Sequence, residues 1–155
     1  MTAGHTATAH AVAPPGFSPV EEEAFMTTVG PLYVRPNDAG LWDVGLRALP
    51  QHANWLDAVH GGMLVTLADY AVGLNLLDAQ VPNARLGAVS LNIDFISAAR
   101  VGEWLKVDVQ VDKVNGRLRF GSCAMRGESQ RLVLRASSAF SSTAPSPVSR
   151  SWKTS

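Results

Sequence analysis

The stretch GGMLVTLADYAVGLNLL, residues 61–77, constrains the fold more than any other part of the chain. It contains no proline, and Asp69 is its one charged residue. An apolar run of this length is too long for a buried strand, so it predicts a helix from Gly62 to about Asp78. A helix that is apolar on nearly every side must be wrapped by other structure. The rest of the chain therefore has to surround a central helix.

The remaining segments supply a sheet that can do this. PLYVR and LWDVGLRAL precede the helix and are separated by the turn cluster PNDAG. AVSLNIDFI, EWLKVDVQVDKV, RLRFGSCAMR and RLVLRASSAF follow it, largely with alternating apolar and polar side chains, and NG at residues 115–116 is typical of a hairpin. Consecutive strands of this kind predict an α+β fold, in which one antiparallel sheet wraps around a long central apolar helix. Because one small sheet rarely covers such a helix completely, we expect a partner subunit to complete the cover.

A second, short helix is predicted in SPVEEEAFMTTVG, residues 18–30. Ser18 can cap it, Pro19 suits its first turn, and Glu21 to Glu23 complement its dipole. Gly30, followed by proline, then stops the helix.

Composition and charge restrict the class of protein. Lys+Arg and Asp+Glu both number 13, which argues against a general nucleic-acid binder and gives no broad attraction to an anionic membrane. The single cysteine, Cys123, allows no intrachain disulfide and is expected to be a small buried side chain. No signal peptide or membrane span is visible, so we expect a cytoplasmic protein. We expect flexible tails at residues 1–16 and 143–155 and one domain over residues 17–142.

Asp69 is the first candidate functional residue. Buried without a partner, its carboxylate would cost several kcal/mol or take up a proton. It must therefore either face a polar cleft or cap an internal group, and because an internal structural aspartate is uncommon in a small domain, we expect a functional role. Gly61 and Gly62 lie where the helix begins, and unpaired amides at the positive end of a helix dipole suit a developing oxyanion. The alternative is that these glycines only make a tight turn.

Polar residues also precede the helix. Asn54 could orient a water or a carbonyl group, and His60 could act as a base. Each could equally be a loop residue that bonds local backbone, and Asp57 could be a turn residue. The chain has neither G-x-S-x-G nor H-E-x-x-H, so a serine-triad hydrolase lacks its sequence signal.

NWLDAVHGGMLVTLAD resembles N-x-x-G-x-x-H-G-G followed by an aspartate eight residues after the first glycine. This is the pattern of hotdog-fold acyl-CoA thioesterases of the PaaI, or 4HBT, type. GAVSLNIDFISAARVGEWLKVDVQV is similar to the family's strand after the helix and its P-A-x-x-G-D/E step, so the resemblance covers about residues 30–142. It implies the hotdog fold, active sites at the interface of a homodimer, and homotetramers as a common assembly.

The resemblance also implies hydrolysis of an acyl-CoA to free acid and CoA, without a metal or any cofactor beyond the substrate's own CoA. Gly61 would offer its amide to the thioester oxygen, and Asp69 of the partner subunit would be general base or nucleophile. Asn54 would position the water or the leaving sulfur. His60 would hold the turn and contact the thioester. Ser90 matches a family Ser/Thr position that assists near the carboxylate.

The acyl pocket is less defined. Gly62 and Met63 are expected to contact the substrate. Trp55, Tyr70 and Phe95 could line the pocket, although such residues are more often core. Aryl, short-chain and medium-chain acyl groups are all compatible with the sequence.

The chain departs from the family pattern in two places. Asp57 stands where the family has glycine; aspartate tolerates a left-handed backbone, but its charge could raise the pKa of Asp69. The alternation of AVSLNIDFI places Ser90 opposite Leu91 and Ile93, so Ser90 faces the helix only if a bulge intervenes.

Two other functions compete with hydrolysis. A non-catalytic acyl-CoA-binding sensor would share the fold, but it would not need a carboxylate beside the thioester. A hotdog hydratase or dehydratase would show a D-x-N-P-x-H pattern, which is absent. Cations are available for the CoA phosphates in every case: Arg100, Lys106, Lys113, Arg117, Arg119 and Arg126.

Overall fold

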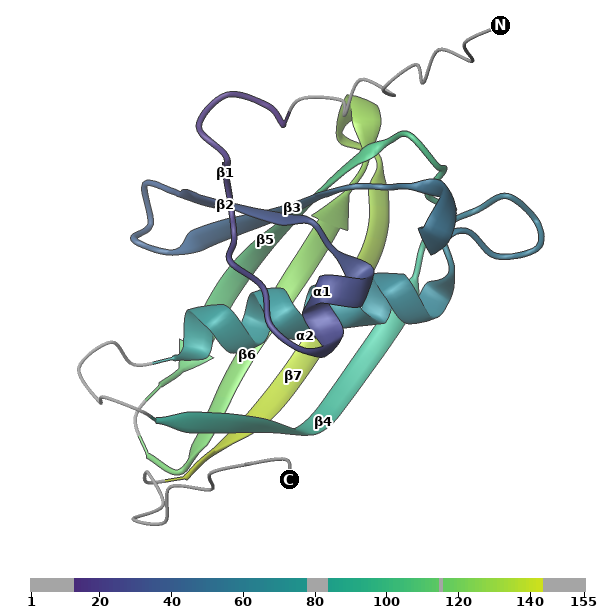
Figure 1. Cartoon of the computed structure of the whole chain (residues 1–155). Helices are drawn as coiled ribbons and strands as arrows, with labels where there is room; N and C mark the ends of the chain where they lie inside the picture. The colour runs from purple at the N-terminus through teal and green to yellow at the C-terminus, as the bar shows by residue number, and fades with distance from the viewer. Residues whose placement is uncertain (1–12, 78–83, 115, 144–155) are drawn as a thin grey trace, which may run out of the picture.

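The computed structural model describes residues 13–77, 84–114 and 116–143 (Figure 1). The predicted tails, 1–16 and 143–155, lie mostly outside these residues. The elements, in chain order, are β1 (Ser18–Pro19), α1 (Phe25–Val29), β2 (Leu32–Pro36), β3 (Trp42–Arg47), the 3-10 turn η1 (Pro50–His52), α2 (Gly61–Leu76), β4 (Arg85–Phe95), β5 (Trp104–Lys113), β6 (Leu118–Arg126), the 3-10 turn η2 (Glu128–Gln130) and β7 (Leu132–Thr143). In this part of the chain, no helix combines the length and apolar character needed to cross a bilayer.

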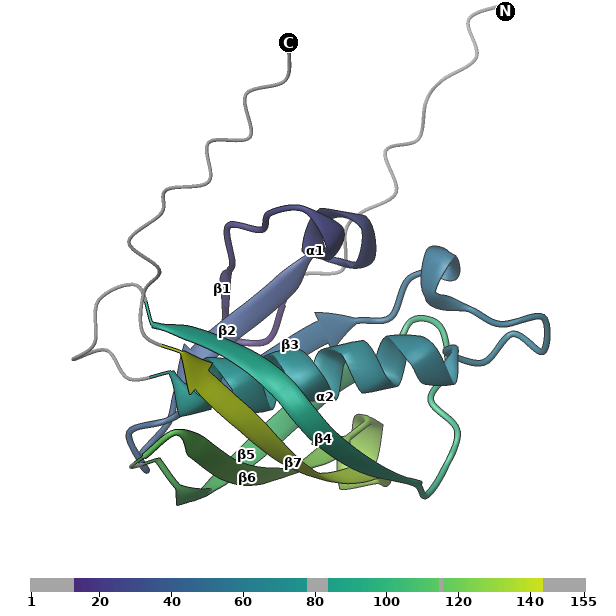
Figure 2. The same cartoon turned by 90° about the horizontal axis from the view of Figure 1, so that it is seen from below.

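The strands form one antiparallel sheet in the order β1-β2-β3-β5-β6-β7-β4. Figure 2 shows this sheet curving beneath α2, while α1 lies on the opposite side of α2. The predicted α+β architecture, an antiparallel sheet wrapped around a long central helix, is confirmed, and this arrangement is the hotdog fold.

Most of α2 is buried by the sheet. Its buried side chains pack against fully buried residues of the strands, such as Leu105, Val107 and Met125. The buried residues of α2 are Met63, Leu64, Leu67, Ala68, Ala71, Val72, Asn75 and Leu76. A second side of the helix is not buried and carries Gly62, Thr66, Asp69 and Gly73. Their spacing of four, three and four residues places them on one face, so the described residues of one chain leave α2 partly uncovered.

The C-terminal end of α2 is closed by two polar side chains of the protein itself. Arg119, 5% exposed, donates from Nη1 to the carbonyl of Leu76 at 2.6 Å. Asn75 accepts the N–H of Trp42 at 2.8 Å and donates to the carbonyls of Trp42 and Ala71, each at 2.9 Å. These bonds fasten the helix to β3 and β6. They also give Arg119 a buried role in ending the helix, away from solvent.

The first half of the predicted helix over residues 18–30 is wrong. Ser18–Pro19 forms β1 and pairs with β2, and α1 begins only at Phe25. The Glu22 carboxylate accepts the main-chain N–H of Leu32, which holds this segment against β2. Pairing with a distant strand has therefore overridden local capping signals. The predicted end of the helix, just before Gly30, is confirmed.

The sheet also buries two side chains of different character. Cys123 is 6% exposed, and burial raises the pKa of its thiol to about 11, so the predicted small buried side chain is confirmed. Asp43, 4% exposed on β3, was not expected to be buried. Burial alone would raise the pKa of Asp43, but hydrogen bonds from Asn37 and Arg35 and the nearby charge of Lys106 lower it on balance.

Candidate active site

The start of α2 leaves one main-chain amide unpaired. His60 caps the helix: its Nδ1 accepts the N–H of Gly62 at 2.8 Å, and its carbonyl accepts the N–H groups of Met63 and Leu64 at 2.9 and 3.2 Å. Among the described residues, no acceptor meets the N–H of Gly61. This amide lies at the positive end of the helix dipole, where a negatively charged oxygen is favoured.

The two glycines have different surroundings in this first turn. An ideal Cβ at position 62 would lie 2.9 Å from Nδ1 and 3.2 Å from Cε1 of His60, so the imidazole occupies the space of a side chain there. A Cβ at position 61 would lie 3.4 Å from the ring of Phe95, which is an ordinary contact. Gly62 therefore permits the histidine cap, and Gly61 keeps a free amide in a less crowded position.

Asn54 orders the loop that leads into this turn. Its Oδ1 accepts the N–H groups of Leu56 and Ala58 at 2.8 and 3.2 Å, and its own N–H donates to the Ala58 carbonyl at 2.7 Å. The side-chain oxygen thus bonds local backbone, while no described residue accepts from Nδ2. Asp57 has φ 60°, so the prediction that aspartate can take the left-handed position of the family's glycine is confirmed.

Asp69 lies two turns into α2, on its uncovered face. The side chain is partly buried, and the described chain offers its carboxylate neither a hydrogen bond nor an ion pair. Burial raises the pKa of Asp69, and it is the sole cause of the shift. Within one chain Asp57 does not contribute to this shift, and its effect on Asp69 of a partner subunit stays a prediction.

The predicted site residues do not all meet within one chain. Asn54, His60 and Gly61 lie together at the start of α2. Asp69 is eight residues farther along the helix, which corresponds to about 12 Å of rise. Ser90 is not brought to them: a bulge falls between Ala88 and Ser90, but it leaves Ser90 on the face of β4 opposite to the side chains packed on the core. The Ser90 carbonyl there accepts the hydroxyl of Ser138.

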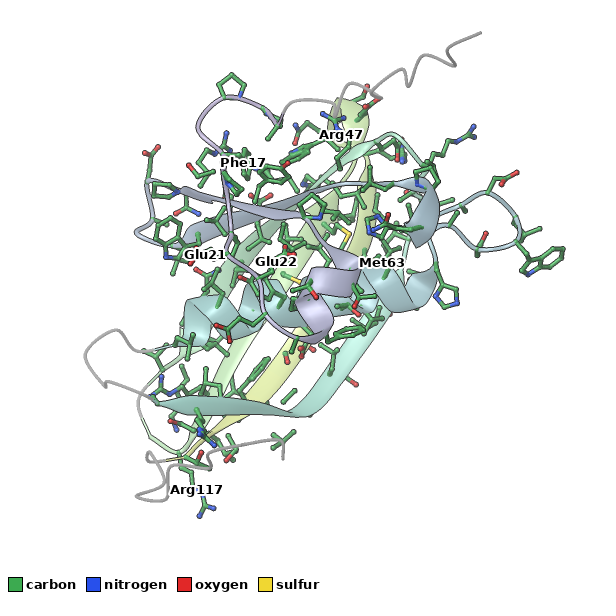
Figure 3. The ribbon with its side chains drawn as sticks, viewed as in Figure 1. Phe17, Glu21, Glu22, Arg47, Met63 and Arg117 are labelled. Carbon is green, nitrogen blue, oxygen red and sulfur yellow. The ribbon has the colours of Figure 1, made fainter. Side chains whose placement is uncertain are left out.

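A pocket of about 470 Å³ opens beside the start of α2. One wall belongs to α1, the other to the first turns of α2, and the floor to the segment around η1. Its lining residues are Phe25, Thr28, Val29, Gln51, His52, Ala53, His60, Gly62, Met63 and Thr66. Figure 3 shows Met63 on α2 next to α1. The pocket thus includes both predicted substrate contacts, Gly62 and Met63.

Large apolar side chains are exposed around this end of the molecule. Trp55 is 90% exposed and Phe95 58%, so neither is a core residue, whereas Tyr70 packs against the core. Leu56 in the same loop and Phe25 in the pocket wall are also exposed. Met63, in contrast, is buried and packs on the core. Phe25 lines the pocket and the Phe95 ring lies against Gly61, so exposed apolar side chains lie beside the candidate site.

The candidate cations lie in different surroundings. Arg100 is exposed and pairs through its backbone with Ala58, beside the loop of Asn54. Lys106 bonds Asp108 at 2.7 Å. Figure 3 places Arg117 at the opposite end of the molecule from Met63. Arg100 is therefore a cation of this set that lies beside the loop.

One buried residue in the pocket floor, His52, had no role in the sequence-based site. It is 4% exposed, and both ring nitrogens have protein partners. No local pattern could have identified it, because one partner is 23 residues away along the chain.

Comparison with known proteins agrees with this arrangement. The sequence model of the thioesterase superfamily matches residues 56–134. A candidate esterase of Pseudomonas aeruginosa is 35% identical over 128 residues, covering 82% of this chain and 95% of that protein. The fold is similar to a hypothetical thioesterase protein from Streptococcus pneumoniae solved with coenzyme A (TM-score 0.65, 17% identity, 74% of this chain and 90% of that one). It is also similar to the PaaI protein of E. coli (TM-score 0.62, 21% identity, 68% and 74%). With this sequence match and this fold, the chain belongs to the hotdog-fold thioesterase superfamily.

Proposed function

We propose that this protein is an acyl-CoA thioesterase that hydrolyses an aryl-, short- or medium-chain acyl-CoA to free acid and CoA. The observation that carries the proposal is the Gly61 N–H, for which the described residues offer no acceptor and which lies between two residues that line the pocket, His60 and Gly62. The Streptococcus pneumoniae protein with this fold was solved with coenzyme A, which supports a CoA ester as the substrate.

The first step places the thioester carbonyl at the start of α2. Its oxygen accepts the Gly61 N–H, and the negative charge that develops during attack is stabilised by this amide and the helix dipole. The acyl group enters the pocket between α1 and α2. Asn54, through its free Nδ2, positions the attacking water or the leaving sulfur, and Arg100 contacts a CoA phosphate.

The second step requires an ionised carboxylate close to the same carbonyl. Asp69 of one chain is about 12 Å along the helix from its own Gly61, so the two cannot act on one carbon atom. We therefore place Asp69 of the partner subunit at each site. As a general base it takes a proton from water, the hydroxide adds to the carbonyl carbon, the C–S bond breaks, and the proton passes to the sulfur of CoA. As a nucleophile it forms a mixed anhydride while the C–S bond breaks and CoA leaves; water then hydrolyses the anhydride to the free acid, restores the Asp69 carboxylate and supplies the proton of the CoA thiol.

A homodimer follows from this requirement. The uncovered face of α2 carries Asp69 between small residues, and β4 lies at one edge of the sheet, where β7 is its neighbour among the described strands. Both features leave room for a second copy of the chain. The homotetramer implied by the family resemblance stays a prediction.

Hydrolysis of an acyl-CoA panel, followed with a thiol-detecting dye, tests the function. Asp69→Asn should reduce kcat by about a hundredfold or more, because it removes the base or nucleophile. Asp112→Asn, at an exposed aspartate of β5, is the matched control and should retain full activity.

Gly61→Pro tests the oxyanion amide separately. Proline has no N–H but suits the first position of a helix, and His60, with φ −59° and ψ 134°, already has the conformation favoured before proline. We expect a loss of about a hundredfold in kcat without unfolding. If wild type binds CoA esters but hydrolyses none of them, the alternative of a non-catalytic acyl-CoA-binding protein replaces this proposal.

A further inference from the structure

His52 has a fixed tautomer in the floor of the pocket. Its Nδ1 accepts the main-chain N–H of Leu49 at 2.9 Å, so Nδ1 carries no proton. The proton is therefore on Nε2, which lies 2.6 Å from the Val29 carbonyl and donates to it. Both ring nitrogens are occupied by the protein, which leaves His52 no free lone pair to act as a base.

The neutral ring is the form that this environment favours. Burial lowers the pKa of His52, although the Val29 carbonyl acts in the opposite direction. A proton on Nδ1 would point at the Leu49 N–H and break that hydrogen bond. The ring of His52 thus acts as a structural link between the main chain at Leu49 and the main chain at Val29.

These contacts connect the two walls of the pocket. Val29 is the last residue of α1, which forms one wall. The main-chain carbonyl of His52 accepts the N–H of His60 at 2.8 Å, and His60 in turn holds Gly62 at the start of α2. One residue therefore links α1 to the turn that carries the unpaired Gly61 amide.

We propose that His52 is a positioning residue that sets the width of the acyl pocket, by holding α1 at a fixed distance from the start of α2. The proposal rests on the thioesterase activity proposed above. His52 acts through Val29 and His60 and does not touch the thioester. Acyl groups that reach between the two walls depend on this distance, whereas an acetyl group does not fill the space between them.

Two substitutions separate the two ring bonds. The Oδ1 of asparagine can take the place of Nδ1, and the amide nitrogen of glutamine can take the place of Nε2–H. His52→Asn can therefore keep the bond from Leu49 and lose the bond to α1. His52→Gln can keep the bond to Val29, and both variants retain the carbonyl that holds His60.

The first measurement is kcat/KM across acyl lengths. His52→Asn should lower kcat/KM about tenfold for hexanoyl- and phenylacetyl-CoA, mainly through KM, and less than about threefold for acetyl-CoA. His52→Gln should stay within about threefold of wild type on all three esters. Val107→Ala, a destabilising change in the distant core of β5, is the control and should affect all esters equally. Equal losses across acyl lengths in His52→Asn, or the same loss in both His52 variants, would overturn the proposal.

Hydrogen exchange tests whether His52 holds α1 in place, even if the protein hydrolyses no ester. The Gly30 N–H, bonded to Met26 at the end of α1, should exchange about tenfold faster in His52→Asn and at the wild-type rate in His52→Gln. Inactive wild type with this exchange pattern would refute the thioesterase and keep the role of His52 in positioning α1. If both variants fail to fold, 15N NMR of wild type remains: a protonated Nδ1 on His52 would contradict the proposal.

Discussion

The two ends of α2 differ in whether their main-chain groups find hydrogen-bond partners within the protein. Every helix terminus leaves main-chain groups without intrahelical partners. At the C-terminal end, buried Arg119 bonds the Leu76 carbonyl, and Asn75 ties the helix to β3. At the N-terminal end, the described residues leave Gly61 N–H without an acceptor beside an open pocket. A ligand is therefore expected at the N-terminal end of α2, where the Gly61 N–H can still donate a hydrogen bond.

Asp43 and Asp69 differ in the same way, in whether described residues bond the carboxylate. Asp43 is buried on the outer side of the sheet, where hydrogen bonds and nearby cations overcome burial and lower its pKa. Asp69 has no such partner within the described chain, and burial raises its pKa. The Asp43 carboxylate has hydrogen-bond partners in the protein, whereas Asp69, the carboxylate that we propose to be reactive, has a charge that burial disfavours.

The largest expected effect on stability is at the closed end. Asn75→Leu removes three hydrogen bonds and leaves the N–H and carbonyl of Trp42 without partners, which should lower the unfolding free energy by about 2 kcal/mol. Urea unfolding measures the change, with Asn92→Leu at an exposed position of β4 as the control. Activity per folded molecule should not change. A loss of activity without a loss of stability would contradict the assignment of this end to structure alone.

A smaller effect is expected at the open end. The methyl group of Gly62→Ala would lie within 3 Å of His60 and displace the imidazole, which disturbs the turn that presents Gly61. We expect kcat/KM to fall about tenfold, equivalent to about 1.4 kcal/mol. Thermal stability should hold, because alanine favours the helix. Gly87→Ala, where a Cβ meets nothing within 4 Å, is the control; equal activity in both variants would show that the histidine cap is dispensable.

The smallest expected effect is a gain in stability. Burial disfavours the charge of Asp69 only in the folded state, so Asp69→Asn should raise the unfolding free energy at pH 7. We expect a gain at the small end of single substitutions, below about 1 kcal/mol. The gain should shrink as the pH falls through the raised pKa and vanish below the ordinary aspartate pKa, where both states are protonated. Thermal melts between pH 4 and pH 7 would follow this change. A loss of stability at pH 7 would instead reveal a stabilising partner for the carboxylate from a second chain.

The sequence predicts features that depend on local pattern. The apolar run of residues 61–77 identified α2, and alternation identified the strands that surround it. Glycines before an aspartate in that run located the candidate site. The start of α1 was predicted wrongly, because its position depends on the contact between Glu22 and Leu32 in a neighbouring strand.

Features that depend on distant contacts were not predictable in the same way. Asp43 lies in an alternating strand like a solvent-facing residue, and its burial follows from Arg35 and Lys106 on adjacent strands. His52 is distinguished by a bond to a residue in another element, Val29. The exposure of Trp55 follows from the tight loop around Asn54, which leaves its side chain outside the core.

The separation of eight positions between Gly61 and Asp69 has a consequence in genetic terms. If each site takes its amide from one chain and its carboxylate from the other, two different inactive alleles can complement each other. Co-expressed Gly61→Pro and Asp69→Asn chains would pair at random, half of the dimers would be mixed, and each mixed dimer would contain one intact site. About a quarter of the wild-type activity would return in such a cell. Recessive lesions at the two ends of this short interval would then behave as if they lay in separate genes.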